Sequence, residues 1–163
     1  MEKFCLDEVV CLPCAQSPLK NNRPIASPLE RLRWLKKGLV GERWAKVSSL
    51  EIARAGTSYS VDTASYWRKK NPNAKLFWIM GSDQWKVLPQ WKEFKKLARW
   101  VHFLVFPRPV PPKSRRGIRM SLLPARFDLS STQIRHRLRQ GLSIRGMVLP
   151  QIEKLVQESR SYR

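Results

Sequence analysis

The sequence predicts an α/β fold in which a parallel sheet is flanked by helices. Short apolar runs alternate with helical patterns along the whole of the 163 residues. One run, residues 76–80, is apolar without interruption, which is typical of a strand covered on both faces. Because strands that alternate with helices favour parallel pairing, we expect one domain spanning residues 1–163.

The first predicted elements are a strand, a helix and a second strand. An apolar run predicts a strand over residues 6–12. Ser27, followed three residues later by Glu30, is the signature of a capping box, and a proline occupies the first helical position between them. Gly38 predicts the end of this helix. A second short strand is expected over residues 45–50.

The middle of the chain continues the alternation. Ser60 is the predicted N-cap of a helix that Asn71, placed before a proline, should end. After the apolar run described above, a short helix is expected over residues 91–98 and a further strand over residues 101–106. The segment 108–117 is rich in proline and basic residues, which predicts a loop.

Two helices complete the order. Ser130 and Gln133 have the spacing of a second capping box, so a helix should run over residues 131–140 and stop at Gly141. A last helix is expected over residues 150–158.

The start of the helix at 131–140 is a candidate phosphate site. Hydroxyls at Ser130, Ser131 and Thr132 lie where free backbone N–H groups and the positive end of the helix dipole would meet an anion. Arg135 adds a cation one turn later. The alternative is an ordinary capped surface helix whose arginines form a solvated face.

The net charge of the chain indicates which class of partner it binds. The chain has 32 Lys and Arg against 12 Asp and Glu, a formal net charge of +20, which favours anionic partners. Basic residues interleaved with seven tryptophans could bind nucleic acid, but the same distribution also fits an overall charge bias. With no apolar run of about 18 residues and no signal-peptide pattern, we expect a cytoplasmic protein without a membrane span.

The cysteines do not indicate a metal or disulfide framework. Cys5, Cys11 and Cys14 are an odd number in a chain with no export signal. Cys11 and Cys14 have the spacing of a zinc or redox pair, yet no second pair follows, and His102 and His136 are distant in sequence.

Ligands of parallel α/β sheets bind beyond the carboxyl ends of the strands. The segments in that position are residues 13–20, 56–60, 81–83 and 107–109, together with the Ser130 helix. Small residues, a carboxylate and cations are the composition of a nucleotide site.

Motifs in these segments carry a resemblance. In chain order they are Leu6-Asp7-Glu8-Val9-Val10 with Ser17-Pro18-Leu19-Lys20, Ser58-Tyr59-Ser60-Val61-Asp62-Thr63, Gly81-Ser82-Asp83, Leu88-Pro89-Gln90-Trp91, His102-Phe103 with Pro107-Arg108-Pro109, and Ser130-Ser131-Thr132-Gln133-Ile134-Arg135. Their order and spacing resemble those of bacterial nicotinate-nucleotide adenylyltransferases over nearly the whole chain.

The resemblance implies a Rossmann-like nucleotidyltransferase fold. It also implies transfer of the adenylyl group of ATP to nicotinate mononucleotide, with Mg²⁺, to form nicotinate adenine dinucleotide and pyrophosphate. Such a reaction depends on positioning and charge neutralisation.

Site residues follow from the same motifs. The resemblance implies that ATP is bound by Ser130, Ser131, Thr132, Arg135, Asp83 and Gly81, with Asp83 at ribose hydroxyls. It implies that the nicotinate nucleotide is bound by Trp91, Ser58, Tyr59, Ser60, Lys20 and Arg108, with Trp91 stacking on the pyridine ring. Each has a structural alternative: Trp91 as a core residue, Asp83 as a helix cap and Lys20 as a solvated cation.

One family motif has no counterpart here. Gly-x-Phe-Asp-Pro-x-His-x-Gly-His, which binds ATP phosphates in the family, does not occur in these 163 residues. We expect the first strand and most of the first helix of the fold to be missing, and the true start to lie upstream. The alternative is a truncated, inactive remnant.

Two other functions stay open. The chain could be a basic nucleic-acid-binding module on the same scaffold, with salt-dependent affinity. The acceptor could also be nicotinamide mononucleotide or phosphopantetheine. The motifs around Tyr59 and Trp91 favour nicotinate.

Overall fold

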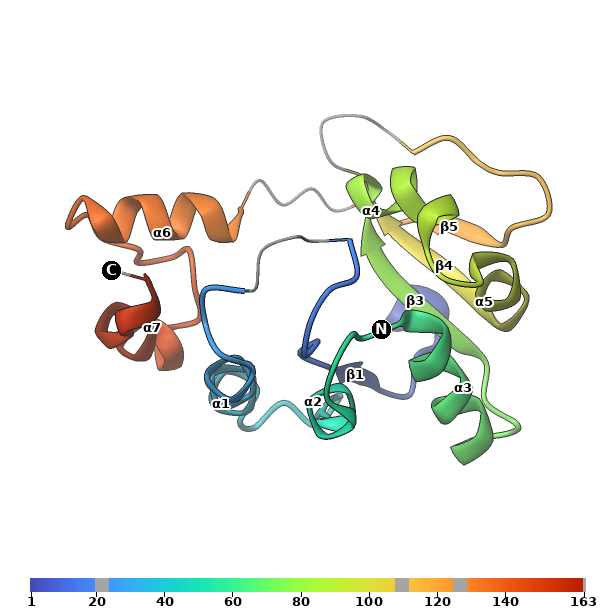
Figure 1. The fold of residues 1–163 in the computed structure, drawn as a ribbon, viewed down its shortest axis with the longest axis horizontal. Coiled ribbons are helices and arrows are strands. Elements are labelled where there is room, and N and C mark those ends of the chain that lie inside the picture. Colours follow the sequence, from blue (N-terminus) through green and yellow to red (C-terminus); the bar gives the residue numbers. More distant parts are fainter. Residues whose placement is uncertain (20–23, 108–111, 125–128, 163) are drawn as a thin grey trace. The chain divides into compact units, whose positions relative to one another are not determined.

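The computed structural model describes residues 1–19, 24–107, 112–124 and 129–162. They form two compact units, each with its own parallel sheet (Figure 1). Unit 1 comprises Met1–Ser58 and Leu129–Arg163, and unit 2 comprises Tyr59–Asp128. The predicted parallel α/β fold is confirmed, and the described strands divide into two separate sheets. The single domain over residues 1–163 stays a prediction.

Unit 1 combines a two-stranded sheet with short and long helices. Strands β1 (Val9–Cys11) and β2 (Ala45–Val47) pair in parallel. The helices are η1 (Glu2–Phe4), α1 (Pro28–Gly38), α2 (Leu50–Arg54), α6 (Ser131–Arg139), α7 (Pro150–Glu158) and η3 (Arg160–Tyr162).

Helix α1 begins as the sequence predicts. The Glu30 N–H donates to Ser27 Oγ at 3.2 Å, and the Ser27 N–H donates to Glu30 Oε2 at 2.9 Å, so both halves of the capping box are present. The helix continues through Gly38, and Leu39 is its C-cap. Local hydrogen bonding therefore fixes where this helix starts.

Helix α6 has the predicted N-cap, Ser130, and the predicted stop at Gly141, and it ends at Arg139 with Gln140 as its C-cap. The Gln133 N–H donates to Ser130 Oγ at 3.2 Å. Gly141 adopts φ +67°, and the N–H groups of Gly141 and Leu142 donate to the carbonyls of Leu138 and Arg137 at 3.0 and 2.9 Å. This pair of bonds is a Schellman motif, which requires a residue that tolerates left-handed backbone.

Two expectations for unit 1 need correction. The strand predicted over residues 6–12 is limited to β1. The strand predicted over 45–50 ends at Val47, and Leu50 instead begins helix α2. The Leu50 N–H donates to Ser48 Oγ at 3.3 Å, so a serine turn ends the strand.

Unit 2 is built on a three-stranded parallel sheet of order β3-β4-β5 (Figure 1). The strands are β3 (Leu76–Gly81), β4 (Val101–Phe106) and β5 (Met120–Leu122), and the helices are α3 (Ser60–Lys70), α4 (Ser82–Val87), η2 (Leu88–Gln90) and α5 (Phe94–Trp100). None of the described helices in either unit has the length and apolar character needed to cross a membrane.

The core of unit 2 lies between its helices and one face of the sheet. Its buried cluster is Val61, Ala64, Met80, Trp85, Leu88, Leu97, Ala98, Val101, Phe103 and Val105. The opposite face of β3 is less covered, because the Ile79 side chain there is 43% exposed. The prediction that residues 76–80 are buried on both faces is therefore wrong, because the face that carries Ile79 is not fully covered by other side chains.

Three further boundaries in unit 2 differ from expectation. Ser60 is the first residue of α3, and Tyr59 is the N-cap. The helix predicted over 91–98 begins at Phe94 and ends at Trp100. Helix α4 and strand β5 were not predicted. Alternation of Ile118, Met120 and Leu122 with polar residues is the signal that indicates β5.

Candidate nucleotide site

The exposed first turn of α6 is the candidate phosphate site of unit 1. Ser130, Ser131 and Thr132 are all exposed, and Ser130 is the N-cap. The positive end of the helix dipole and the N–H groups of the first turn face outward from such a helix start. The predicted placement is confirmed, whereas the binding of phosphate stays a prediction.

Arg135 lies against this first turn. Its Nη2 donates to Thr132 Oγ1 at 3.1 Å, and its guanidinium carbon lies 5.8 Å from the ring centroid of Tyr162. These contacts hold the cation beside a hydroxyl at the helix start. A phosphate there would meet the guanidinium and the backbone N–H groups together.

Ser58 is buried and hydrogen-bonded within unit 1. Its side chain is only 8% exposed, and Oγ accepts a hydrogen bond from the Ala15 N–H at 2.9 Å. The Ser58 N–H also donates to the Gln16 carbonyl at 2.8 Å. Ser58 thus joins two segments that follow β1 and β2 in the chain, and its hydroxyl hydrogen can still be donated elsewhere.

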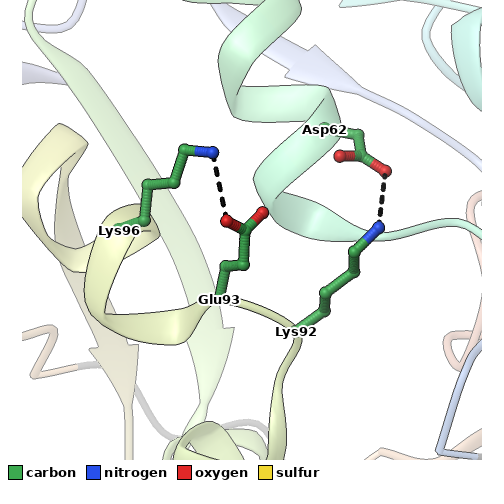
Figure 2. Close-up of polar contacts among 4 residues, drawn as sticks. All are labelled: Asp62, Lys92, Glu93 and Lys96. Atoms are coloured by element: carbon green, nitrogen blue, oxygen red, sulfur yellow. Dashed lines mark hydrogen bonds and ion pairs between the residues drawn. The ribbon is translucent and has the colours of Figure 1, made fainter.

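In unit 2, the residues at the start of α3 lie beside those that precede α5. Lys92 Nζ is 4.4 Å from the ring centroid of Tyr59. It is also 3.9 Å from Asp62 Oδ2 (Figure 2). Glu93, the next residue, pairs with Lys96 at 3.1 Å. Lys92 was not among the predicted site residues. Its position directly after Trp91 in the motif is the signal that could have found it.

Trp91 is half-buried and packs on the edge of the core. Its ring makes an edge-to-face contact with Trp78, with centroids 6.4 Å apart and planes at 78°. The backbone N–H of Trp91 donates to the Leu88 carbonyl at 3.0 Å, which fixes the turn between η2 and α5. The core contact predicted as an alternative is therefore present, and the ring keeps some exposed surface.

Gly81 and Asp83 occupy the carboxyl end of β3. Gly81 is the last residue of this strand, and Asp83 is exposed in the first turn of α4. Asp83 Oδ2 accepts a hydrogen bond from Gln84 Nε2 at 3.2 Å. The predicted location directly after this strand is confirmed. The alternative of Asp83 as a cap is wrong, because Gly81 is the N-cap.

Two predicted site residues, Lys20 and Arg108, lie outside the described residues. Among the residues that the structure does describe, no group of three or more His, Cys, Asp or Glu side chains is arranged to hold a metal ion. Burial raises the pKa of the Cys11 thiol, which disfavours the reactive thiolate.

The chain matches the cytidylyltransferase-like family model over residues 1–137. It is 34% identical over 164 residues to a protein of Methylacidiphilum infernorum named probable nicotinate-nucleotide adenylyltransferase, covering 99% of this chain and 80% of that protein. A protein of the same name from Opitutus terrae is 34% identical over 167 residues, covering 99% and 86%.

A solved structure shares the fold. The Plasmodium falciparum nicotinic acid mononucleotide adenylyltransferase complexed with NaAD matches with a TM-score of 0.70 at 17% identity, covering 92% of this chain and 82% of that one. The structural likeness supports the Rossmann-like nucleotidyltransferase fold that the motifs imply. By the identity and coverage of its relatives, the chain belongs to the nicotinate-nucleotide adenylyltransferase family.

Proposed function

We propose that this protein transfers the adenylyl group of ATP to nicotinate mononucleotide, forming nicotinate adenine dinucleotide and pyrophosphate for NAD synthesis. The observation that carries the proposal, beyond family membership, is the arrangement in unit 2. There Lys92 joins the start of α3 to the Trp91 turn, so two of the family's motifs meet in one place.

The nicotinate nucleotide is assigned to this arrangement in unit 2. The remaining exposed surface of Trp91 can stack on a pyridine ring. Backbone N–H groups at Tyr59 and Ser60 lie at the start of α3, where the helix dipole favours a carboxylate. Lys92 adds a cation at the same end of the helix. Nicotinate carries a carboxylate and nicotinamide does not, so these groups favour the nicotinate nucleotide.

On the family's motifs, ATP contacts are assigned to the α6 start in unit 1 and, separately, to the residues after β3 in unit 2. Ser130, Ser131, Thr132 and Arg135 would neutralise its phosphates, and Asp83 beside Gly81 would accept hydrogen bonds from ribose hydroxyls. Lys20 is assigned to a substrate phosphate and Arg108 to the edge of the nicotinate pocket on the motifs alone. Ser58, whose hydroxyl hydrogen is available, would support the turn before Tyr59.

Mg²⁺ is expected to arrive with ATP. Mg²⁺ commonly binds through substrate phosphates and few protein carboxylates, so MgATP is the expected form of this substrate. In the reaction, a phosphate oxygen of nicotinate mononucleotide attacks the α-phosphorus of ATP. The bond from that phosphorus to the bridging oxygen breaks, and pyrophosphate leaves with its electron pair.

The direct test uses the protein purified from its native source with MgATP and nicotinate mononucleotide. Chromatography should show nicotinate adenine dinucleotide and pyrophosphate in equal amounts. Nicotinamide mononucleotide and phosphopantetheine, supplied separately, should react at a lower kcat/KM. A faster reaction with either would reassign the acceptor, and no product with any acceptor would contradict adenylyl transfer.

Asp83→Ala tests the ATP assignment. It should raise the KM for ATP, because a carboxylate that binds ribose hydroxyls is lost, and hydrogen bonds to a charged group contribute about 1.5–3 kcal/mol. The KM for nicotinate mononucleotide should stay the same. Unchanged kinetics for both substrates would exclude this role.

A further inference from the structure

In unit 2, the described carboxylates and a group of six basic side chains lie at opposite ends of the sheet. Its three described carboxylates lie at helix starts: Asp62 in the first turn of α3, Asp83 in the first turn of α4, and Glu93 as the N-cap of α5. Helix α3 leads through a loop into the start of β3, and α5 leads directly into β4 (Figure 1). The starts of these two helices therefore lie towards the carboxyl ends of the strands.

At the opposite end of the sheet, all the charged side chains among the described residues of unit 2 are cations. The parallel register pairs Leu76 with Val101, and Phe103 with Met120, so all three strands begin at this end. Six exposed basic side chains lie on the residues that enter the strands or end the helices there. This amino-end patch consists of Arg68, Lys69, Lys70, Lys75, Arg99 and Arg119.

Contacts hold part of the amino-end patch together. Arg119 Nη2 donates to the Arg99 carbonyl at 3.1 Å. Arg68 and Lys96 place their cationic groups 5.2 and 5.4 Å from the ring centroid of Trp100. These contacts bring cations from α3, α5 and the start of β5 onto one surface.

No ion pair described in unit 2 neutralises the charge of the amino-end patch. The ion pairs described in unit 2 are Asp62 with Lys92 and Glu93 with Lys96, and neither involves a member of the patch. Burial and the positive charge of Arg119 both lower the pKa of His102. The field of Arg119 thus reaches a neighbouring side chain.

Helix dipoles explain only some of these cations. Basic residues in a last helical turn are stabilised by the dipole, which accounts for Arg68, Lys69 and Lys70 in α3 and for Arg99 in α5. Lys75 and Arg119 lie outside helices, just before strands. Lys75 and Arg119 therefore extend the positive charge across the amino ends of the three strands, where unit 2 has no described carboxylate.

We propose that the amino-end patch of unit 2 binds the phosphate backbone of nucleic acid. The contact is independent of base sequence, because both neighbours of the Trp100 ring are cations and the patch offers charge more than base-reading groups. This surface lies at the opposite end of the sheet from Gly81 and Asp83, so the inference does not depend on the proposed adenylyl transfer.

Binding to an anionic membrane would require an exposed apolar face beside the cations. Interfacial binding combines cations with a buried apolar face. The exposed large apolar side chains described in unit 2 are Tyr66, Ile79 and Leu122, and only Tyr66 belongs to an element that ends in the patch. A single tyrosine does not form an apolar face, so nucleic acid is the better match.

The experiment compares two triple variants of equal net charge. Lys69→Gln, Lys75→Gln and Arg99→Gln remove half of the patch without touching the contacts of Arg68 or Arg119. The control, Lys36→Gln, Lys37→Gln and Arg43→Gln, removes three exposed cations from unit 1. Two of these lie in the last turn of α1, as Lys69 lies in the last turn of α3.

Fluorescence anisotropy with a labelled 20-nucleotide RNA of mixed sequence, at several salt concentrations, measures the affinity. For the patch variant we expect affinity to fall at least tenfold, and the slope of log affinity against log salt to decrease by about 2, at roughly 0.7 per lost phosphate contact. The control should lose no more than about twofold in affinity, and its slope should change by less than 1.

Equal losses in the two variants would show that only net charge matters and would overturn the proposal. The proposal would also fail if the wild-type protein bound phosphatidylserine vesicles more tightly than RNA through the same three residues. Adenylyl transfer, measured in parallel, should be unchanged in the patch variant, so failure of this inference and failure of the proposed function give different results.

Discussion

The two units reach their stability in different ways. Unit 2 buries a continuous apolar cluster under its sheet, with Trp85, Leu88, Leu97 and Phe103 at 2% exposure or less. In unit 1 the buried apolar side chains described are few: Ala26, Ile144 and Val156. We infer that unit 2 depends on hydrophobic burial and that unit 1 depends more on oriented hydrogen bonds.

Glu30 illustrates the polar organisation of unit 1. Besides capping α1, its carboxylate accepts hydrogen bonds from Ser159 Oγ at 3.1 Å and from Ser161 Oγ at 3.0 Å. Gln151 Nε2 donates to the Gly38 carbonyl at 3.0 Å. The C-terminal segment is thus bound to α1 by charged and polar groups. The comparison predicts different responses to substitution in the two units.

The largest effect is expected from Phe103→Ala in unit 2. Phe103 is fully buried and packs edge-to-face on Trp85 with ring centroids 5.5 Å apart. Removing the ring should lower the free energy of unfolding by about 3–5 kcal/mol, because burial is lost and a cavity remains. Urea unfolding measures the change. Ile79→Ala, on the exposed face of β3, is the control and should cost about 1 kcal/mol or less.

Trp91→Ala should have the next largest effect, a loss of activity with nicotinate mononucleotide. If the ring stacks on the pyridine, kcat/KM for nicotinate mononucleotide should fall about 10- to 100-fold, the size expected for losing an aromatic stacking platform. Trp91→Phe should restore most of the activity, since it keeps a ring. A stability loss with unchanged KM in Trp91→Ala would assign the residue to the core alone.

A pair of capping serines in unit 1 separates stability from binding. Ser130→Ala and Ser27→Ala each remove an N-cap and should each cost about 1 kcal/mol. Only Ser130→Ala should raise the KM for ATP, because the proposed phosphate site is at the start of α6. Steady-state kinetics at varied ATP concentration provides the check. An equal rise in both variants would contradict the phosphate role.

The smallest expected effect is a pH dependence carried by Glu30. The hydrogen bond from the Ser27 N–H, together with those from the serine hydroxyls, lowers the pKa of this carboxyl in the folded protein. Its stabilisation is therefore fully present above the unfolded pKa of about 4.3 and is lost as pH falls through the lower folded value. In Glu30→Gln the thermal midpoint should fall less steeply below that pH. A slope equal to that of the wild type would refute the assignment.

The sequence by itself determined features that depend on neighbours in the chain. The caps at Ser27 and Ser130 and the stop at Gly141 involve bonds between residues no more than five apart, so residue types at fixed spacing were enough to predict them. The strand at 101–106 was also predicted correctly, because this short segment is rich in β-branched and aromatic residues and is followed by a proline. The motifs identified the family and named the residues of the candidate site.

Only the tertiary structure decided features that depend on distant partners. Ile79 has the same apolar character as its neighbours in β3, and its exposure depends on which side chains pack on each face of the strand. The contact of Lys92 with Tyr59 joins residues 33 positions apart in the chain, through the packing of α3 near α5. The positive charge at the amino end of the unit 2 sheet arises in the same way. Parallel pairing places residues that are distant in sequence at the same end of the sheet.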